Sequence, residues 1–235
     1  MADHKVVSPD HWVEARKQLL AKEKEFTKLR DQLSEARRNL PWERVDKHYV
    51  FDGPKGKETL ADLFDGRSQL VVYHFMFGPD WEVGCKSCSF WADNFERNVV
   101  HLKARDVTTI AISRAPIEKL TAFQKRLGWT FKWVSSLNND FNFDYHVSFT
   151  PEELAKGEGY YNYALSKGFQ GDERPGISVF YRDAGGAIYH TYSCYGRGLD
   201  LMNTAYNILD LVPLGRNEAE DGPQSWVRLR DNYGR

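Results

Sequence analysis

The sequence lacks the features of a membrane-spanning or nucleic-acid-binding protein. None of its apolar runs approaches the roughly 20 residues that cross a bilayer. Its 235 residues have a formal net charge of −1 and carry neither a basic block nor an acidic tail, so we expect no nucleic-acid partner and no membrane partner. Residues 1–7 lack the apolar region of a signal peptide, and we therefore expect a cytoplasmic location.

Cysteine is also scarce, with three residues in the chain. Cys85 and Cys88 form a Cys-x-x-Cys pair, and Cys194 lies far along the sequence. A structural zinc ion needs four ligands, and the sequence has no second Cys-x-x-Cys and no His-x-x-x-His. We therefore expect no metal and no cofactor, and we expect Cys194 to be a small buried apolar residue. Half of a zinc site, or two ordinary buried cysteines, remain the alternatives to a redox pair.

The residues around the pair predict a strand, a loop and a helix, in that order. An apolar run at 70–77 precedes the pair, and a helix-like stretch at 90–102 follows it. This layout is typical of a thioredoxin-type redox site. A cysteine at a helix N-terminus faces unpaired backbone N–H groups and the positive end of the helix dipole, which favour the thiolate. In the cytoplasm such a pair is more often catalytic than structural.

Within the pair, we expect Cys85 to be the nucleophile because it lies nearest the start of the helix. Cys88, one turn further on, is expected to resolve the mixed disulfide that Cys85 forms with a substrate. Lys86 lies between them, and its positive charge favours a thiolate, although an exposed lysine is screened by solvent. The alternative for Lys86 is a solvated side chain without a role.

Residues 9–40 predict one long helix, which forms a separate N-terminal arm over residues 1–41. Ser8 is a suitable N-cap, and Pro9 fits the first helical position. Apolar residues recur along the helix every seven positions: Trp12, Leu19, Phe26, Leu33 and Leu40. A narrow stripe of this kind favours packing against another helix, so we expect a homodimer through it. A helix that lies on its own domain is the alternative.

The segment 42–212 is expected to form one α/β domain with a thioredoxin-like fold, which is a central mixed sheet flanked by helices. A short hairpin over 49–60 comes first. Three predicted strands then alternate with helices, and an antiparallel pair and a last helix follow, which is the βαβ then ββα order of that fold. The three strands and the pair are at 69–77, 107–113, 131–134 and 177–192. Residues 213–235 are expected to be a polar tail on the surface.

An irregular, aromatic insertion occupies residues 136–174. Long loops of this kind are usually functional or disordered, and the many aromatic residues argue against disorder. Asp144 and His146 are therefore candidates for substrate contact. Local capping of turns is the alternative role for both.

Four segments make the chain resemble a known family. The sequence is similar to a bacterial family of thioredoxin-like proteins described as predicted dithiol–disulfide oxidoreductases, which otherwise have no assigned function. The similarity covers nearly the whole chain and is carried by residues 73–81, 85–93, 141–144 and 175–181. The resemblance implies a redox-active domain that exchanges a Cys85–Cys88 disulfide with a thiol or disulfide substrate, or with a redox partner protein.

The resemblance also implies roles for residues near the pair. Thioredoxin-like sites place a cis-proline just before the strand that faces the cysteines, and Pro175 precedes the β-run at 177–181. With a cis bond, Arg174 would lie beside the thiols, where its guanidinium could stabilise a thiolate or bind an anionic substrate. From their positions on either side of the pair, Trp81 or Trp91 is a candidate wall of the site, with core packing as the alternative. A trans proline that opens an edge strand is the alternative for Pro175.

Two other functions remain open. A peroxiredoxin-like peroxide reductase shares the fold, but such enzymes use a Pro-x-x-x-Thr/Ser-x-x-Cys pattern. Here Gly78 and Glu82 occupy the positions of the proline and the hydroxyl relative to Cys85. The second alternative is a thioredoxin-fold binding or scaffold module without catalysis, which would use the aromatic insertion as its binding surface.

Overall fold

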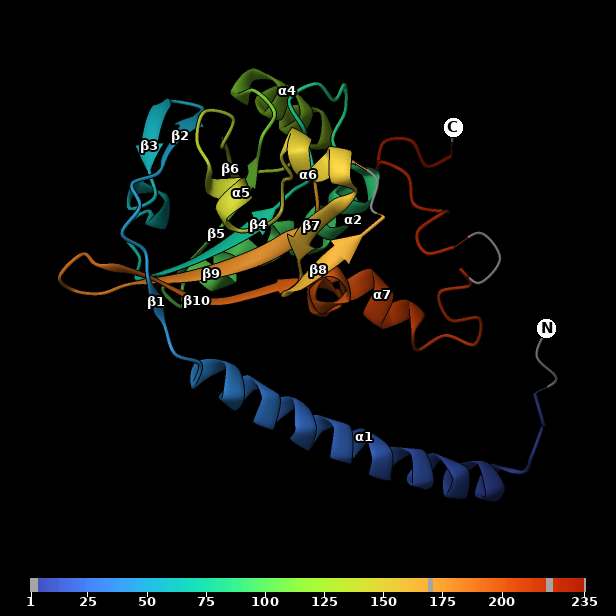
Figure 1. The fold of residues 1–235 in the computed structure, drawn as a ribbon. Helices are drawn as coiled ribbons and strands as arrows, with labels where there is room; N and C mark the ends of the chain where they lie inside the picture. The colour runs from blue at the N-terminus through green and yellow to red at the C-terminus, as the bar shows by residue number, and fades with distance from the viewer. Residues whose placement is uncertain (1–3, 169–170, 219–221, 235) are drawn as a thin grey trace. The chain divides into compact units, whose positions relative to one another are not determined.

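The computed structural model describes residues 4–168, 171–218 and 222–234. Contacts between Cα atoms divide the chain into two compact units, residues 1–41 and residues 42–235. Figure 1 shows the secondary structure of each unit. The two units are described separately below.

The first unit consists of one long helix, α1 (Pro9–Arg38). The Ser8 hydroxyl accepts a hydrogen bond from the backbone N–H of His11 at 3.4 Å, and Pro9 opens the helix. The helix ends two residues earlier than the sequence predicted. None of the residues of α1, all of which the structure describes, is buried. The apolar residues of its seven-residue repeat are therefore exposed.

The second unit is built on a mixed sheet. Within the described residues it contains eight strands in the order β1-β10-β9-β4-β5-β6-β2-β3. Strands β4, β5 and β6 are parallel, and β9 runs antiparallel to β4 on its other side. The bounds are β1 (Glu43–Arg44), β2 (Val50–Gly53), β3 (Gly56–Thr59), β4 (Gln69–His74), β5 (Val107–Ser113), β6 (Lys132–Ser135), β9 (Gly176–Arg182) and β10 (Ile188–Tyr195). This sheet, with helices between its parallel strands, confirms the predicted α/β thioredoxin-like fold.

Helices connect the parallel strands. Strand β4 leads to α2 (Lys86–Phe95) and α3 (Val99–Lys103), and β5 leads to α4 (Ile117–Leu127), which ends at Gly128 with a φ of 70°. The helix predicted at 90–102 thus starts earlier and is interrupted by a 3₁₀ turn. After β10, a 3₁₀ segment (Gly196–Met202) precedes α7 (Thr204–Leu209). In the described part of the chain, no helix combines the length and the apolar character needed to cross a membrane.

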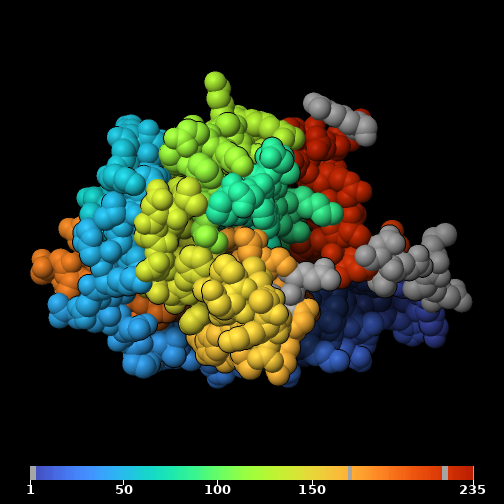
Figure 2. Space-filling view, turned by 45° about the horizontal axis from the view of Figure 1, so that its top comes forward, coloured from blue at the N-terminus to red at the C-terminus, as the bar shows by residue number. Residues whose placement is uncertain are grey.

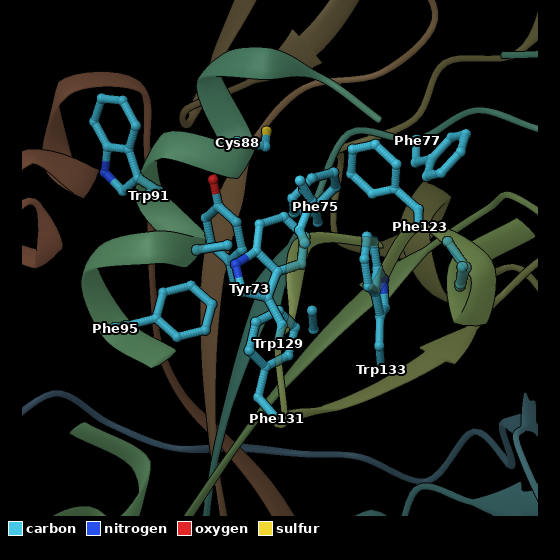
Figure 3. Close-up of a cluster of buried hydrophobic side chains, with 14 of the residues drawn as sticks. Tyr73, Phe75, Phe77, Cys88, Trp91, Phe95, Phe123, Trp129, Phe131 and Trp133 are labelled. Carbon is cyan, nitrogen blue, oxygen red and sulfur yellow. The ribbon is translucent and has the colours of Figure 1, made fainter. Parts of the chain in front are cut away.

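The alternation of side chains along β4 divides the core into two clusters, because neighbouring residues of a strand point to opposite faces. Tyr73 joins a cluster with Trp91 of α2 and Phe123 of α4. Leu70 and Val72 join the other cluster, on the opposite side of the sheet. The face that carries Tyr73 is therefore the face on which the helix with the cysteines packs (Figure 3).

The aromatic insertion is more regular than the sequence suggested. It contains α5 (Phe141–Asp144), α6 (Pro151–Lys156) and a hairpin of β7 (Glu158–Tyr161) and β8 (Ala164–Lys167). The turn of this hairpin places Asn162 and Tyr163 at φ values of 53° and 64°. Two-residue turns with positive φ favour Asn and Gly, and a tyrosine at the second position hides the signal in the sequence.

The C-terminal segment 213–235, expected as a surface tail, contributes to the core. Val227 is fully buried and Leu229 is 8% exposed. Two exposed ion pairs also fasten this segment, Arg126 to Asp231 at 2.7 Å and Arg230 to Asp93 at 3.3 Å. Its buried apolar residues, Val227 and Leu229, form only a short run among polar residues, which is why the sequence did not reveal them.

Candidate functional site

Cys85 is the N-cap of α2, as the order of strand, loop and helix predicted. Its backbone N–H donates to the carbonyl of Met76 at 3.1 Å, which ties the loop back to the end of β4. Its carbonyl accepts hydrogen bonds from the backbone N–H and the hydroxyl of Ser89, both at 2.9 Å. The sulfur of Cys85 therefore lies at the positive end of the helix.

The surroundings of Cys85 stabilise its thiolate. A hydrogen bond from the thiol of Cys88 is the largest cause, and the backbone N–H groups of Cys88 and Ser87 add to it, while burial acts in the opposite direction. Together they lower the pKa of Cys85 from 9.0 to about 6. These contacts therefore favour the thiolate form of Cys85 at neutral pH.

Cys88 lies one turn further along α2 and has the opposite character. It is 2% exposed, and burial raises its pKa well above 9.0. Its sulfur accepts hydrogen bonds from the backbone N–H of Met76 at 3.4 Å and from the hydroxyl of Tyr73. Both thiols, which lie in the described part of the chain, are free. The pair thus combines a thiolate with a buried thiol that donates to it.

Tyr73 is a site residue that the sequence analysis did not identify. Its ring is 1% exposed and packs edge-on against Phe75 and Phe95. Figure 3 shows its hydroxyl pointing toward Cys88 from below α2. In the sequence Tyr73 is one of several large residues in a buried strand. Its side chain lies on the side of the cysteines only because side chains alternate between the two faces along β4.

A pocket of about 310 Å³ opens beside Cys88. Aromatic and aliphatic side chains dominate its walls, and its rim carries charged residues. The walls include Tyr73, Met76, Cys88, Trp91, Leu199 and Tyr206, and the rim includes Arg197, Asp200, Arg216 and Glu218. Trp91 is 5% exposed, and its indole N–H donates to the carbonyl of Leu199 at 2.8 Å.

The C-terminal segment forms one wall of this pocket. The carboxylate of Glu218 accepts hydrogen bonds from the Tyr206 hydroxyl at 2.8 Å, the Gln224 backbone N–H at 3.0 Å and the Trp226 indole N–H at 2.7 Å. In Figure 2 this segment, in red, lies beside the teal surface of the loop and helix start that follow β4. Its polar sequence gave no sign of this role.

Pro175 also lines the pocket, but its peptide bond is not the expected cis bond. Among the described residues no peptide bond is cis. The preceding residues are in an extended pairing: the backbone N–H of Arg174 donates to Val147 at 2.7 Å, and Ser148 and Glu173 form an isolated bridge. This pairing brings the chain into β9 in an extended form, which suits a trans proline at the start of a strand.

The guanidinium of Arg174 is held by its own loop. It donates to the carbonyls of Glu173 at 2.7 Å and Gly171 at 3.4 Å, and it lies 5.7 Å from the centre of the Phe149 ring. Arg174 was expected beside the thiols only if the peptide bond before Pro175 were cis, and that bond is trans. The largest contributions that lower the pKa of Cys85 come from Cys88 and Ser87.

Glu173 is a buried acid close to Pro175 in the sequence. Its carboxylate is 1% exposed, forms an ion pair with Arg114 at 3.4 Å and accepts a hydrogen bond from Ser148 at 2.9 Å. Burial raises its pKa to about 7 despite these contacts. The three side chains anchor the loop that positions Pro175.

Trp81 and Lys86 lie on either side of Cys85 in the sequence. Trp81 is partly buried against the core cluster that contains Tyr73, and the Lys119 ammonium donates to its carbonyl at 3.1 Å. Its ring lies so close to Gly78 that a Cβ there would lie 2.7 Å from the indole nitrogen. Lys86 is exposed, and its ammonium donates to the carbonyl of Ser225 at 3.3 Å. Lys86 therefore contacts the C-terminal segment.

Asp144 and His146 lie in a different cleft, of about 470 Å³. The carboxylate of Asp144 accepts hydrogen bonds from Lys47 at 2.6 Å and from the Tyr49 hydroxyl at 2.7 Å. The ring of His146 packs edge-on against Tyr160. Neither cysteine of the pair is among the described residues that line this cleft, so the structure does not bring these two candidates to the redox pair.

The buried His74 and Cys194 make contacts within the core. His74 is fully buried, shares a hydrogen bond with Ser178 at 2.8 Å, and has its pKa lowered by burial to about 3. Cys194 is 8% exposed, and its thiol donates to the carbonyl of Gly198 at 3.6 Å. In the described part of the chain, no three His, Cys, Asp or Glu side chains gather as metal ligands would.

The sheet order and a cysteine pair at the start of the first helix after a central parallel strand define a thioredoxin-like protein. The chain belongs to DUF899, a family of bacterial proteins of unknown function, whose model matches residues 1–233. No curated protein matches the chain significantly.

Solved structures with a similar arrangement include redox proteins. The peroxidoxin BcpB from Mycobacterium tuberculosis is 11% identical, with a TM-score of 0.45 over 70% of this chain and 94% of that chain. A cysteine-to-serine mutant of peroxiredoxin Q from Xanthomonas campestris is 12% identical, with a TM-score of 0.46 over 72% and 98%. A putative thiol:disulfide interchange protein DsbE from Chlorobium tepidum is 14% identical, with a TM-score of 0.39 over 71% and 98%. With all three scores below 0.5, the fold assignment rests on the sheet order.

Proposed function

We propose that the protein is a dithiol–disulfide oxidoreductase that uses Cys85 and Cys88. The observation that carries this proposal is the position of the pair, with Cys85 at the N-cap of α2 and the buried Cys88 one turn further on. In this arrangement the hydrogen bond from Cys88 is the largest of several causes that lower the pKa of Cys85 to about 6. A thiolate at a helix start is the nucleophile that disulfide exchange requires.

The reduction of a substrate disulfide takes two exchanges. The Cys85 thiolate attacks one substrate sulfur, the substrate S–S bond breaks, and the first substrate thiolate leaves and takes a proton from solvent. Cys88 then gives up its proton and attacks the sulfur of Cys85. The bond between Cys85 and the substrate breaks, and the second thiolate leaves and takes up a proton. The substrate gains two electrons, and the protein is left with a Cys85–Cys88 disulfide.

Tyr73 and Met76 assist the second exchange. Cys88 must carry negative charge as it attacks, and burial makes that charge costly. The hydroxyl of Tyr73 and the backbone N–H of Met76 both donate to its sulfur and stabilise the charge. A thiol reductant or a redox partner protein of the cell returns the pair to the dithiol form, and the same steps in reverse oxidise a dithiol substrate.

The reduction of insulin disulfides tests this proposal. Purified protein with dithiothreitol should accelerate insulin precipitation over dithiothreitol alone, and Cys85→Ser should remove the acceleration. Cys194→Ser is the matched control, since its thiol lies outside the pair, and it should retain the activity. An equal rate for wild type and Cys85→Ser would reject the oxidoreductase.

The same variants separate the two alternatives. A peroxide reductase would consume hydrogen peroxide with Cys85 as its nucleophile, although Gly78 and Glu82 stand where a peroxiredoxin motif has its proline and hydroxyl. A scaffold would retain its cellular effect in Cys85→Ser. We expect peroxide consumption at the level of an ordinary thiol and a cellular effect that depends on Cys85.

We also propose that α1 pairs with α1 of a second copy of the chain. Its apolar residues recur every seven positions and are exposed, with Phe26 64% exposed. In a parallel pair, Glu25 of one helix lies next to Arg30 of the other, at the flanking positions where opposite charges attract. A lone helix gains little stability without such packing.

A further inference from the structure

The pocket beside Cys88 has the walls of a binding site for an apolar group. Tyr73 and Trp91 are almost fully buried and expose only a small part of their rings. Leu199 and Tyr206, each 2% exposed, complete the interior. Ligand pockets are commonly lined in this way, with a few polar groups that fix the orientation of the ligand.

The size of the pocket limits what enters it. The pocket has a volume of about 310 Å³. This is at the lower end of the range for small-molecule sites. A single ring or a short aliphatic chain fits within this volume.

Three of the four charged residues at the rim contact one another. Arg216 forms ion pairs with Asp200 at 3.1 Å and Asp210 at 2.8 Å. Its guanidinium also lies 3.9 Å from the centre of the Tyr206 ring. Arg197 is 88% exposed and contacts the same Asp200.

Glu218, the remaining charged group of the rim, is held by its three hydrogen-bond donors. A charged ligand would lose its hydration here and would have to compete with contacts that these groups already make. The rim therefore favours an uncharged ligand.

We infer that this pocket binds the uncharged, apolar half of a low-molecular-weight disulfide, whose S–S bond then meets the cysteine pair. The inference rests on the proposed function, and it names the substrate class. Cys88 lines the pocket, and the attacking group, Cys85, lies one turn away at the N-cap of α2, outside the described residues that line the pocket. With benzyl methyl disulfide as the substrate, the reduced protein yields phenylmethanethiol, methanethiol and the Cys85–Cys88 disulfide, so two electrons pass from the pair to the probe.

Single-turnover kinetics test the substrate class. Reduced protein is mixed with benzyl methyl disulfide or with glutathione disulfide, which is charged, and each rate constant is divided by that of dithiothreitol with the same compound. This division removes the intrinsic reactivity of the two disulfides. We expect the normalised rate for the benzyl compound to be at least tenfold higher, and equal normalised rates would overturn the inference.

A binding measurement separates this inference from the redox proposal. Benzyl methyl sulfide has the same ring but no bond to reduce, and ligand-observed NMR reports its binding to the reduced protein. Met76→Trp, which fills the pocket and retains the backbone N–H, should abolish binding. Met202→Trp is the matched control, because Met202 lines a different groove, and it should bind the sulfide as the wild type does.

The possible outcomes are distinct. Binding that is lost only in Met76→Trp, without turnover of any disulfide, would reject the oxidoreductase and leave the apolar site in place. Reduction of insulin without binding of the sulfide would retain the oxidoreductase and reject the pocket as its substrate site. The wild-type comparison of the two disulfides decides the substrate class even if Met76→Trp does not fold.

Discussion

The hydroxyl of Tyr73 donates a hydrogen bond to the sulfur of Cys88, the deeper of the two cysteines. The two side chains come from different elements, β4 and α2, and both are almost fully buried. The bond links the interior of the fold to the thiol that completes the exchange in the proposed mechanism. In that mechanism Tyr73 positions Cys88 and stabilises its charge, which packing alone does not require.

Replacing Tyr73 by Phe should slow the second exchange. The variant keeps the ring in the core but leaves the developing charge on Cys88 with the Met76 N–H as its donor. Hydrogen bonds to charged groups contribute about 1.5–3 kcal/mol, so the resolution rate should fall roughly tenfold or more. Acid quenching followed by mass spectrometry should show the mixed disulfide on Cys85 accumulating.

The first exchange is the control for this variant. Alkylation of Cys85 should proceed at the wild-type rate in Tyr73→Phe, because Tyr73 contacts the other sulfur. A general loss of packing would slow or accelerate both steps together. An unchanged resolution rate would show that the hydroxyl has no part in the chemistry.

The reactivity of Cys85 should follow its ionisation. With a pKa of about 6, its alkylation by iodoacetamide should rise with pH and reach half of its maximum near pH 6. Cys88→Ala removes the largest cause of the shift, so the midpoint should move upward toward 9. Cys194→Ser should leave it in place. A wild-type midpoint near 9 would contradict the hydrogen bond between the two thiols.

The buried His74 should make the protein less stable in acid. Its pKa is about 3 in the folded state and 6.5 as the ordinary value, so between these values the unfolded chain binds the additional proton. The free energy of unfolding should therefore fall as the pH drops below 6.5, by about 2 kcal/mol from this group at pH 5. Urea unfolding at pH 5, 6 and 7 measures the slope.

A matched variant isolates this contribution. His74→Gln carries no titratable group, and its free energy of unfolding should depend less steeply on pH between 5 and 7. The buried Glu173 acts in the opposite direction, because its raised pKa of about 7 means that the folded state holds its proton longer. That contribution is common to both proteins and cancels in their difference. Parallel pH profiles would exclude His74 as a source of acid sensitivity.

The apolar stripe of α1 should control the oligomeric state. Replacing Phe26 and Leu33 by Glu puts a negative charge at the same position of two successive seven-residue repeats. A helix–helix interface does not accommodate such charges. Sedimentation velocity should show a dimer for the wild type and a monomer for the double variant. Thr27→Glu with Ser34→Glu, which lie one residue outside the stripe, should remain dimeric. A monomeric wild type would reject the pairing of α1.

Much of the fold could be predicted from local patterns. The apolar run before Cys85 and the Asp-Ala-Gly-Gly turn between β9 and β10 each specify their element over a short distance. So do Ser8 and Pro9 at the start of α1. The position of Cys85 at a helix start followed from the same kind of local information. These features depend on residues close together in the sequence.

The parts that could not be predicted depend on distant residues. The hydrogen bond of Tyr73 to Cys88 needs the register between β4 and α2. The C-terminal wall of the pocket depends on Glu218 meeting Tyr206, and neither residue signals the other. The trans bond at Pro175 follows from the extended pairing of Arg174 with Val147, which lies far away in the sequence.

The reduction potential of the Cys85–Cys88 pair tests the central claim most directly. Protein equilibrated with dithiothreitol buffers of graded oxidation, quenched and alkylated, is examined by mass spectrometry for the peptide that contains both cysteines. The account predicts that the two thiols of this peptide disappear together, reversibly and with a single two-electron midpoint. The account would be contradicted if both thiols could still be alkylated, after unfolding, in the samples from every buffer.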